Sequence, residues 1–517
     1  MKFYTKYNSG LATLEIVIAL GIITLAIAAL ILISFGNQTI ATENEINNDA
    51  LYRTRNLVEN GRAEIKNNFY ADINATSSED IFNKSITALD INVCKRRVIG
   101  TVNWETEASR SQHIEIKTDV ISINEAEALD GDCGSDNPPI SEWWYPNTFK
   151  DYDLKTIDPP SERSSNAGVP ATSIDIIKKN SSRYAILTTA HNSENDLWLI
   201  NINDPLNAFV AGSVETTERG LNTADATQDL AFALSRGSWD TQPSELHIID
   251  ISSVVPPYSV ATKSLDILGI DQENNPNANS IYYYDGKVYV GTHKTGGKEF
   301  QIFSGIAPYS KIAELEITHN INSIIVRGDY AYFATSDDTG EFMAVNINPA
   351  SPDYMIHPDI TGMKYDTTKD FDAISLYLLG NKAYLGRDGG NYNNTDARNF
   401  VILDISDLNN IAELGSKFIP SNAGPNKAVE VLDLFVVGDF AFISTDDDNF
   451  EFQVYRVGDP SDIYNCDELD DPQYPDNCGK YNFPAKMVDL EFDDNLIYSA
   501  VESNATFRVI FDDLSQY

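Results

Sequence analysis

The sequence predicts a long N-terminal α-helix with a small α+β head, followed by an all-β propeller of about seven four-stranded blades. Three observations support this fold class: an apolar run near the N-terminus, apolar residues at helical spacing directly after it, and a strand pattern that repeats through the rest of the chain. With 517 residues the chain is too long for one ordinary core, so more than one domain is expected.

Residues 11–35 form a continuous apolar run, LATLEIVIALGIITLAIAALILISF, with one charged side chain, Glu15. This run is long enough to cross a bilayer as a helix. Lys2 and Lys6 precede it without an acidic residue, so the positive-inside rule places the N-terminus in the cytoplasm and the chain after the run outside. Because a carboxylate in such a run is costly, Glu15 is expected to be functional or paired.

The order Gly10, Leu11 and then Glu15 resembles the type IV prepilin signature. This resemblance implies that a prepilin peptidase removes residues 1–10 as a leader and that Leu11 becomes the mature N-terminus. It also implies that Glu15 pairs with the terminal amine of a neighbouring pilin subunit during assembly. The helix would then hold the chain in the inner membrane first and in a filament later. The alternative is an uncleaved N-terminal membrane anchor.

The apolar run continues as an amphipathic pattern. Apolar or small residues recur at helical spacing: Ile46, Ala50, Leu57, Gly61 and Ile65. The sequence therefore predicts one helix over 11–67, and a small β head over 68–134. Within the head, 94–107 and 110–123 are rich in β-branched residues and favour two strands. This pair resembles the short two-strand head of minor pilins and pseudopilins.

Four cysteines in an exported chain can form two disulfides in three possible pairings. Sequence proximity suggests the pairs Cys94–Cys133 and Cys466–Cys478. No cysteine has the CxxC or Cys/His spacing of a zinc site.

Residues 135–147 contain Pro138-Pro139 among Ser, Asn and Gly and are expected to be a linker. From about residue 171 the chain repeats with a period of roughly 43 to 57 residues, a range typical of propeller blades. Short strands with a small–aromatic core alternate with turns and polar loops. The repeats begin near Ser173, Ala224, Ser280, Ser323, Ala373, Val429 and Val488.

The propeller is expected to occupy residues 148–517. The last repeat holds three strand patterns, and 148–157 is the predicted fourth strand, which would clasp the first and last blades and hide an open edge. The segment LWLININDPLNAFVAGSV (197–214), echoed by FVILDISDLNNIAELGS (400–416), resembles the LVIVD-type repeat of exported β-propeller proteins. That resemblance implies the fold and says nothing about a ligand. A six- or eight-bladed ring is the alternative.

The net charge of −40 disfavours nucleic acid and anionic lipid surfaces as partners. No HExxH, GxSxG, P-loop or GxGxxG motif stands in a fitting context, so no enzymatic activity and no cofactor are expected. Acid-rich loops at 192–196, 337–341 and 446–449 contain oxygen ligands suited to calcium, but none has the spacing of an EF-hand. Solvated turns are the favoured interpretation of these loops.

These observations predict a non-enzymatic, pilin-like surface protein whose propeller is a binding or adhesion head for an unknown surface ligand, protein or glycan. A head this large would crowd a lattice built from every subunit, so a minor component is expected. It would be a single-pass membrane protein before assembly and lie on an extracellular pilus afterwards. The alternatives are a membrane-anchored propeller enzyme or scaffold, with an axial pocket of converging His and carboxylates, and a secretion pseudopilin.

Overall fold

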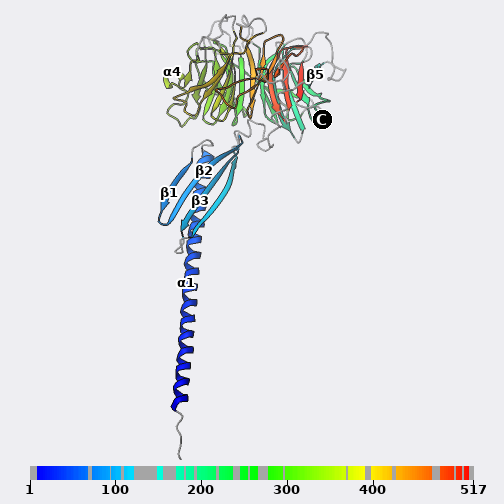
Figure 1. The fold of residues 1–517 in the computed structure, drawn as a ribbon. Coiled ribbons are helices and arrows are strands. Elements are labelled where there is room, and N and C mark those ends of the chain that lie inside the picture. Colours follow the sequence, from blue (N-terminus) through cyan, green and yellow to red (C-terminus); the bar gives the residue numbers. More distant parts are fainter. Residues whose placement is uncertain are drawn as a thin grey trace, which may run out of the picture. The chain divides into compact units, whose positions relative to one another are not determined.

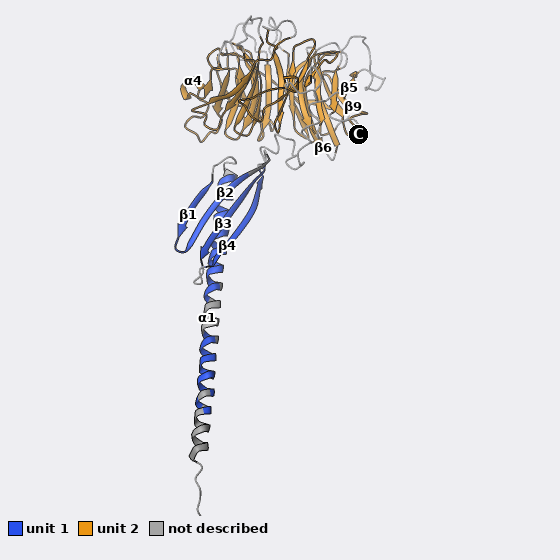
Figure 2. Ribbon diagram, viewed as in Figure 1, with its two compact units in different colours: residues 1–123 blue, residues 124–517 orange. Residues whose placement is uncertain are grey.

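The computed structural model divides the chain into two compact units, residues 1–123 and 124–517 (Figure 2). The residues it describes are 9–67, 73–92, 95–105, 110–121, 148–154, 170–179, 182–190, 195–216, 220–236, 245–253, 257–265, 278–294, 297–367, 371–389, 398–421, 427–468, 478–493, 496–503 and 506–511.

The first unit consists of a helix and a sheet (Figure 1). Helix α1 spans Ser9–Asn67 without interruption. The antiparallel sheet has the order β1-β2-β3-β4, with the bounds β1 Ala75–Glu79, β2 Phe82–Asn92, β3 Lys95–Glu105 and β4 Ser111–Ile121. The prediction of two strands was wrong, because β1 and β2 precede them. β1 (ATSSE) is exposed throughout and has no apolar alternation that could mark it as a strand.

The C-terminal half of α1 packs against this sheet through two small apolar clusters. One contains Val58, Ile65, Ile73, Val98 and Val120, and the other contains Ala50, Phe82, Val102 and Trp104. Glycines permit the close approach: a Cβ on Gly61 would lie 2.4 Å from Ile86 Cδ1, and one on Gly100 would lie 2.6 Å from Val58 Cγ2. The helical spacing that the sequence shows after Ile46 is therefore the stripe that faces the sheet.

The N-terminal half of α1 presents apolar side chains outward. Those between 48% and 73% exposed are Ile18, Leu20, Ile22, Ile23, Leu25, Ile27, Leu30, Ile31 and Leu32. In the described part of the chain, no helix has both the length and the hydropathy of a membrane span. Gly10, Leu11 and Glu15 lie within α1, but their side chains are outside the described residues. Cleavage at Gly10 and pairing by Glu15 therefore stay predictions.

The second unit is a β-propeller. Its described part forms seven four-stranded antiparallel sheets, named blades 1 to 7 in chain order, and the innermost strands contact one another in cyclic order, β30 with β6 included (Figure 1). The start predicted for each blade from the sequence lies within three residues of the first residue of the innermost strand observed in that blade.

The strands of blades 1 to 4 have the following bounds. Blade 1 contains β6 Ala171–Lys179, β7 Ser182–Thr189, β8 Leu197–Asn201 and β9 Phe209–Val214. Blade 2 contains β10 Leu221–Ala226, β11 Leu230–Ser235, β12 Glu245–Asp250 and β13 Tyr258–Ser264. Blade 3 contains β14 Ala278–Tyr284, β15 Lys287–Thr292, β16 Phe300–Ser304 and β17 Lys311–Leu315. Blade 4 contains β18 Ile321–Arg327, β19 Tyr330–Thr335, β20 Phe342–Asn346 and β21 Lys364–Tyr365, with the short helix α4 Pro358–Thr361 between the last two.

The remaining blades complete the ring. Blade 5 contains β22 Ala373–Leu379, β23 Lys382–Arg387, β24 Phe400–Asp404 and β25 Ala412–Lys417. Blade 6 contains β26 Val431–Val437, β27 Phe440–Thr445, β28 Phe452–Arg456 and β29 Lys480–Tyr481, with the 3-10 helix η2 Cys466–Glu468 before β29. Blade 7 contains β30 Met487–Asp493, β31 Leu496–Val501, β32 Phe507–Phe511 and β5 Thr148–Tyr152.

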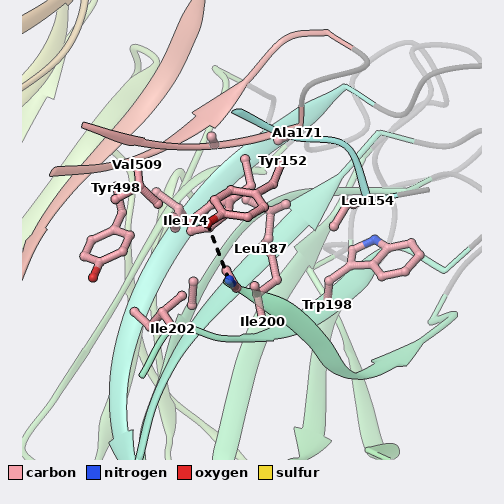
Figure 3. Packing of buried hydrophobic residues seen from close by; sticks show 14 of the residues in the cluster. Tyr152, Leu154, Ala171, Ile174, Leu187, Trp198, Ile200, Ile202, Tyr498 and Val509 are labelled. Atoms are coloured by element: carbon pink, nitrogen blue, oxygen red, sulfur yellow. Dashed lines mark hydrogen bonds between the residues drawn. The ribbon is translucent and has the colours of Figure 1, made fainter. Parts of the chain in front are cut away.

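Ring closure depends on β5, which pairs antiparallel with β32 from Thr148↔Phe511 to Tyr152↔Phe507. β5 ends earlier than the predicted 148–157, and residues 155–157 lie outside the described residues. Figure 3 shows Tyr152 packed among side chains of blades 7 and 1, in a cluster that also contains Ile174, Trp198 and Val509. The Tyr152 hydroxyl donates to the Pro205 carbonyl and accepts from the Ala208 N–H at 3.4 Å. The start of the domain thus completes the core of its last blade.

The disulfide predicted between Cys466 and Cys478 is confirmed, with a Cα–Cα distance of 5.2 Å. Both cysteines are buried in the cluster between blades 6 and 7, where the disulfide ties η2 to the segment before β29. The predicted partners Cys94 and Cys133 lie outside the described residues, so that pairing stays a prediction.

Candidate functional site: the axial channel

The axis of the propeller is a cavity of about 610 Å³, lined by the first strand of each blade: β6, β10, β14, β18, β22, β26 and β30. Each of these strands is the inner edge of its sheet, so half of its backbone N–H and C=O groups have no partner within the blade. Buried backbone groups must be paired. The side chains that meet this need determine the chemistry of the channel.

A β-bulge recurs near the start of all seven inner strands. In blade 1, the first strand pairs with the second, and the register of this pairing shifts between Ala171 and Ser173. The other six blades show the same shift at the corresponding position. A bulge leaves one residue unpaired and re-aims its side chain. In blades 1, 2 and 4 this residue donates to the first carbonyl of the next blade: Thr172 Oγ1 to Leu221 O at 2.8 Å, Asn222 Nδ2 to Ala278 O at 2.6 Å and Asn322 Nδ2 to Ala373 O at 2.7 Å.

Five carboxylates line the channel: Asp175, Asp225, Asp433, Asp489 and Glu491. They come from blades 1, 2, 6 and 7, which are consecutive around the ring. All five are half-buried. This group, called the axial carboxylates below, makes one part of the channel wall acidic.

Blades 3 to 5 complete the wall with different chemistry. At the position that Asp175 and Asp225 occupy in their strands, these blades carry Tyr282, Ile325 and Tyr377. Arg327 is the one basic residue among the described residues that line the cavity, and its Nη1 donates to Gly380 O at 2.6 Å. The channel is therefore polarised, with carboxylates on one part of the wall and mainly aromatic and aliphatic side chains on the rest.

Burial raises the pKa of every axial carboxylate, because the channel wall replaces water around the charged form. The pKa of Asp225 rises to about 7 and that of Asp433 to about 6, although backbone N–H groups that hydrogen bond to these carboxylates oppose both shifts. The pKa values of Asp175, Asp489 and Glu491 are raised well above the usual range by burial and, in addition, by neighbouring carboxylates. At neutral pH the axial carboxylates therefore hold protons more readily than exposed carboxylates do.

The side chains of the channel are suited to hold a polar or cationic group. Half-buried carboxyl groups beside tyrosine rings can accept a cationic or hydroxyl-rich group by hydrogen bonding and by contact with an aromatic face. The described lining contains no histidine, so serine residues in the channel have no imidazole base beside them. Of the converging His and carboxylates expected for a propeller enzyme, the described lining contains the carboxylates.

The axial carboxylates were not identified from the sequence. The pattern that marks them is an acid inside an otherwise apolar first strand, as in SIDII (173–177), VLDLF (431–435) and VDLEF (488–492). A carboxylate at such a position breaks the expected alternation and must find a partner when buried. The partner, however, lies on another blade and cannot be found from local sequence.

In the described parts of the three acid-rich loops, aspartates accept backbone N–H groups. Asp337 Oδ1 accepts from the Thr339 N–H at 2.9 Å, and Asp447 Oδ1 accepts from the Asn449 N–H at 2.9 Å. Asp196 Oδ1 accepts from the Thr216 N–H at 2.8 Å. In the described part of the chain, no group of three or more His, Cys, Asp or Glu is arranged to hold a metal ion.

The acid that directly precedes the third strand has a repeated structural role. In three blades this acid accepts a hydrogen bond from a backbone N–H in the segment after the fourth strand, with a distance of 2.8 Å each time. The pairs are Glu299 with Ile317, Glu341 with Thr367 and Glu451 with Phe483. Asn399 does the same through the Ile419 N–H at 2.7 Å. These side chains connect strands within one blade, so their recurrence in the sequence reflects the fold.

No protein-family model matches the chain, and no curated protein is significantly similar to it in sequence. Among solved structures, BamB from Moraxella catarrhalis is 12% identical over 70% of this chain and 98% of its own, with a TM-score of 0.41. The periplasmic gluconolactonase PpgL of Pseudomonas aeruginosa is 11% identical over 59% of this chain and 89% of its own, with a TM-score of 0.41. YCF48 bound to a D1 peptide is 10% identical over 69% of this chain and 99% of its own, with a TM-score of 0.42. Similarity at this level says nothing about ligand or activity.

Proposed function

We propose that this chain is a minor type IV pilin-like surface protein that carries a seven-bladed propeller as a binding or adhesion head. The observation that carries the proposal is the order Gly10, Leu11 and Glu15 at the start of an apolar segment, together with the continuity of α1 from Ser9 to Asn67. A helix whose second half packs on a sheet and whose first half presents exposed apolar residues needs a second apolar environment for that first half. A membrane before assembly, and other pilin subunits after it, would supply this environment.

The channel favours a binding role for the head. The axial carboxylates and tyrosines form a half-buried, polarised wall with no imidazole among its described residues. The size of the propeller supports the minor role, because a head of this size on every subunit would crowd a filament lattice. The ligand is proposed to be a protein or glycan surface.

Gly10→Ala should abolish removal of residues 1–10, because the added methyl group alters the residue at the proposed cleavage site. The test is intact-mass spectrometry of the full chain co-expressed with a prepilin peptidase. Gly21→Ala, the same change further along the apolar run, is the control and should be processed normally. A wild-type chain that keeps Met1 to Gly10 would contradict the pilin proposal and favour an uncleaved membrane-anchored scaffold.

Glu15→Ala should leave processing intact and lower incorporation into filaments by roughly tenfold or more, because an intramembrane carboxylate would lose its pairing with a neighbouring amine. Quantitative immunoblotting of sheared filaments against the membrane fraction measures this ratio. Glu43→Ala, at an exposed position of the same helix, is the matched control. Equal incorporation of the Glu15 variant and wild type would exclude the assembly role.

A further inference from the structure

Four consecutive blade junctions are bridged by an aspartate of the axial carboxylates. In each, the carboxylate accepts a backbone N–H from the inner strand of the next blade. From blade 6 to blade 7 and from blade 7 to blade 1 the bonds are Leu490 N–H to Asp433 and Ile174 N–H to Asp489, both 2.8 Å. From blade 1 to 2 and from 2 to 3 they are Ala226 N–H to Asp175 at 2.8 Å and Tyr283 N–H to Asp225 at 2.5 Å.

At the other three junctions, the described side chains of the inner strands that bridge the blades are neutral, apart from one arginine. Asn279 Nδ2 donates to Asn322 Oδ1 at 3.3 Å between blades 3 and 4. Asn322 and Arg327 donate to carbonyls of blade 5. Ser375 Oγ donates to Val431 O at 3.2 Å between blades 5 and 6. Among the described inner strands, the carboxylate bridges are thus confined to the part of the ring around the 7–1 junction, where the two ends of the domain meet. The Glu341–Arg387 pair, which joins blades 4 and 5, lies outside the lining of the cavity.

The bridging aspartates interact with one another. Asp433 and Asp489 are close enough for each to influence the pKa of the other, and a proton shared between two such carboxylates would join them. Glu491 lies within electrostatic reach of Asp175, Asp225, Asp433 and Asp489. A set of carboxyl groups in one cavity cannot ionise independently.

Other charged and titratable groups around the cavity do not neutralise this set. Tyr282, Tyr377 and Tyr284 face it from blades 3 and 5, and burial raises the pKa of Tyr282, with further increases from Asp225, Tyr377, Glu491 and Tyr284. Arg327 donates to blade 5. At the 7–1 junction, Lys178 and Arg183 contact Asp493, at 3.2 and 3.1 Å, outside the axial set.

We infer that the axial carboxylates form a proton-sensitive latch on ring closure, which tightens the 7–1 junction and its neighbours when it holds protons and loosens them as it ionises. The inference is independent of the filament role. Its physical basis is the crowding of carboxylates in one cavity: each added negative charge repels the others, whereas a shared proton turns a repulsive pair into a hydrogen bond. In the described lining of the cavity, the inner strands of blades 3, 4 and 5 contribute no carboxylate and should respond little.

The sign of the pH dependence follows from linkage. A carboxyl group whose pKa is higher in the folded than in the unfolded protein binds more protons when folded, so stability falls as pH rises. The window runs from the ordinary aspartate value, about 4, to the raised values of about 6 for Asp433 and about 7 for Asp225. Between pH 5 and pH 8, Asp433 and Asp225 should therefore change from mainly protonated to mainly ionised.

The test is hydrogen exchange of the full-length protein in detergent at pH 5, 6, 7 and 8, corrected for the intrinsic pH dependence of exchange. Peptides covering β30 and β6 should lose roughly tenfold or more of their protection between pH 5 and pH 8, while peptides covering β18 and β22 should change little. Uniform loss across all blades, or no loss at β30 and β6, would overturn the inference.

Asparagine variants identify the responsible groups. Asp489→Asn and Asp225→Asn keep an oxygen that accepts the backbone N–H, so the bridges can form without ionisation, and each variant should flatten the pH response of the adjoining inner strands. Asp338→Asn, at an exposed position, is the matched control and should keep the wild-type profile. If Asp489→Asn fails to fold, Asp225→Asn still decides the question. A wild-type pH profile in a folded variant would show that the latch lies elsewhere.

Discussion

Asp151→Asn should lower the free energy of unfolding of the propeller by about 3–5 kcal/mol, because it leaves a buried guanidinium without its carboxylate. In the structure the fully buried Arg508 of β32 contacts Asp151 of β5 through two hydrogen bonds, Nε to Oδ1 at 2.6 Å and Nη2 to Oδ2 at 3.0 Å. The guanidinium also lies over the rings of Phe149 and Phe483, 5.0 and 4.6 Å from their centroids. The Arg508 side chain therefore connects β5, β32 and the segment that precedes β30.

The measurement is calorimetry of the full-length protein, with hydrogen exchange at residues 148–152 and 507–511 as the local readout. A double variant, Asp151→Asn with Arg508→Met, should be more stable than Asp151→Asn alone, because no unpaired charge remains in the core. Asp338→Asn again serves as the exposed control and should change stability by less than about 0.5 kcal/mol. A loss below about 1 kcal/mol for Asp151→Asn would mean that the pair contributes no more than an exposed salt bridge.

Glu341→Gln should also destabilise the propeller by about 3–5 kcal/mol. Glu341, before the third strand of blade 4, contacts Arg387 of blade 5, with Oε1 and Nη2 3.1 Å apart and both side chains almost fully buried. Glutamine can still accept the Thr367 N–H that Glu341 accepts at 2.8 Å, so the change removes the charge and little else. Burial lowers the pKa of Arg387, a sign that its charge is costly without the carboxylate.

Urea unfolding of the full-length protein, followed by tryptophan fluorescence, measures this loss. Arg387→Met combined with Glu341→Gln should recover much of it, since a neutral pair leaves no buried charge. The control is Glu316→Gln, which breaks the exposed Lys298–Glu316 pair and should cost less than about 1 kcal/mol. Equal effects of Glu316→Gln and Glu341→Gln would refute the argument from burial.

Local patterns in the sequence determined the elements of the propeller. The second strands share a small–aromatic core, and turns such as Asp285-Gly286 separate the first strand from the second, with Gly286 at a φ of 72° that favours glycine. Short-range chemistry also predicted the disulfide between Cys466 and Cys478, because only 12 positions separate them. β1 and β2 were missed, since exposed polar residues such as those of β1 leave no periodic trace.

Only the tertiary structure decided which distant residues meet. Asp489 and Ile174 are 315 positions apart, and Arg508 and Asp151 are 357 apart, yet each pair forms a hydrogen bond across the closed ring. Strand periodicity depends on neighbours along the chain and is therefore visible in the sequence. The partner of a buried charge depends on which blades become adjacent when the ring closes, so the acidic channel and its bridges emerge only from the folded arrangement.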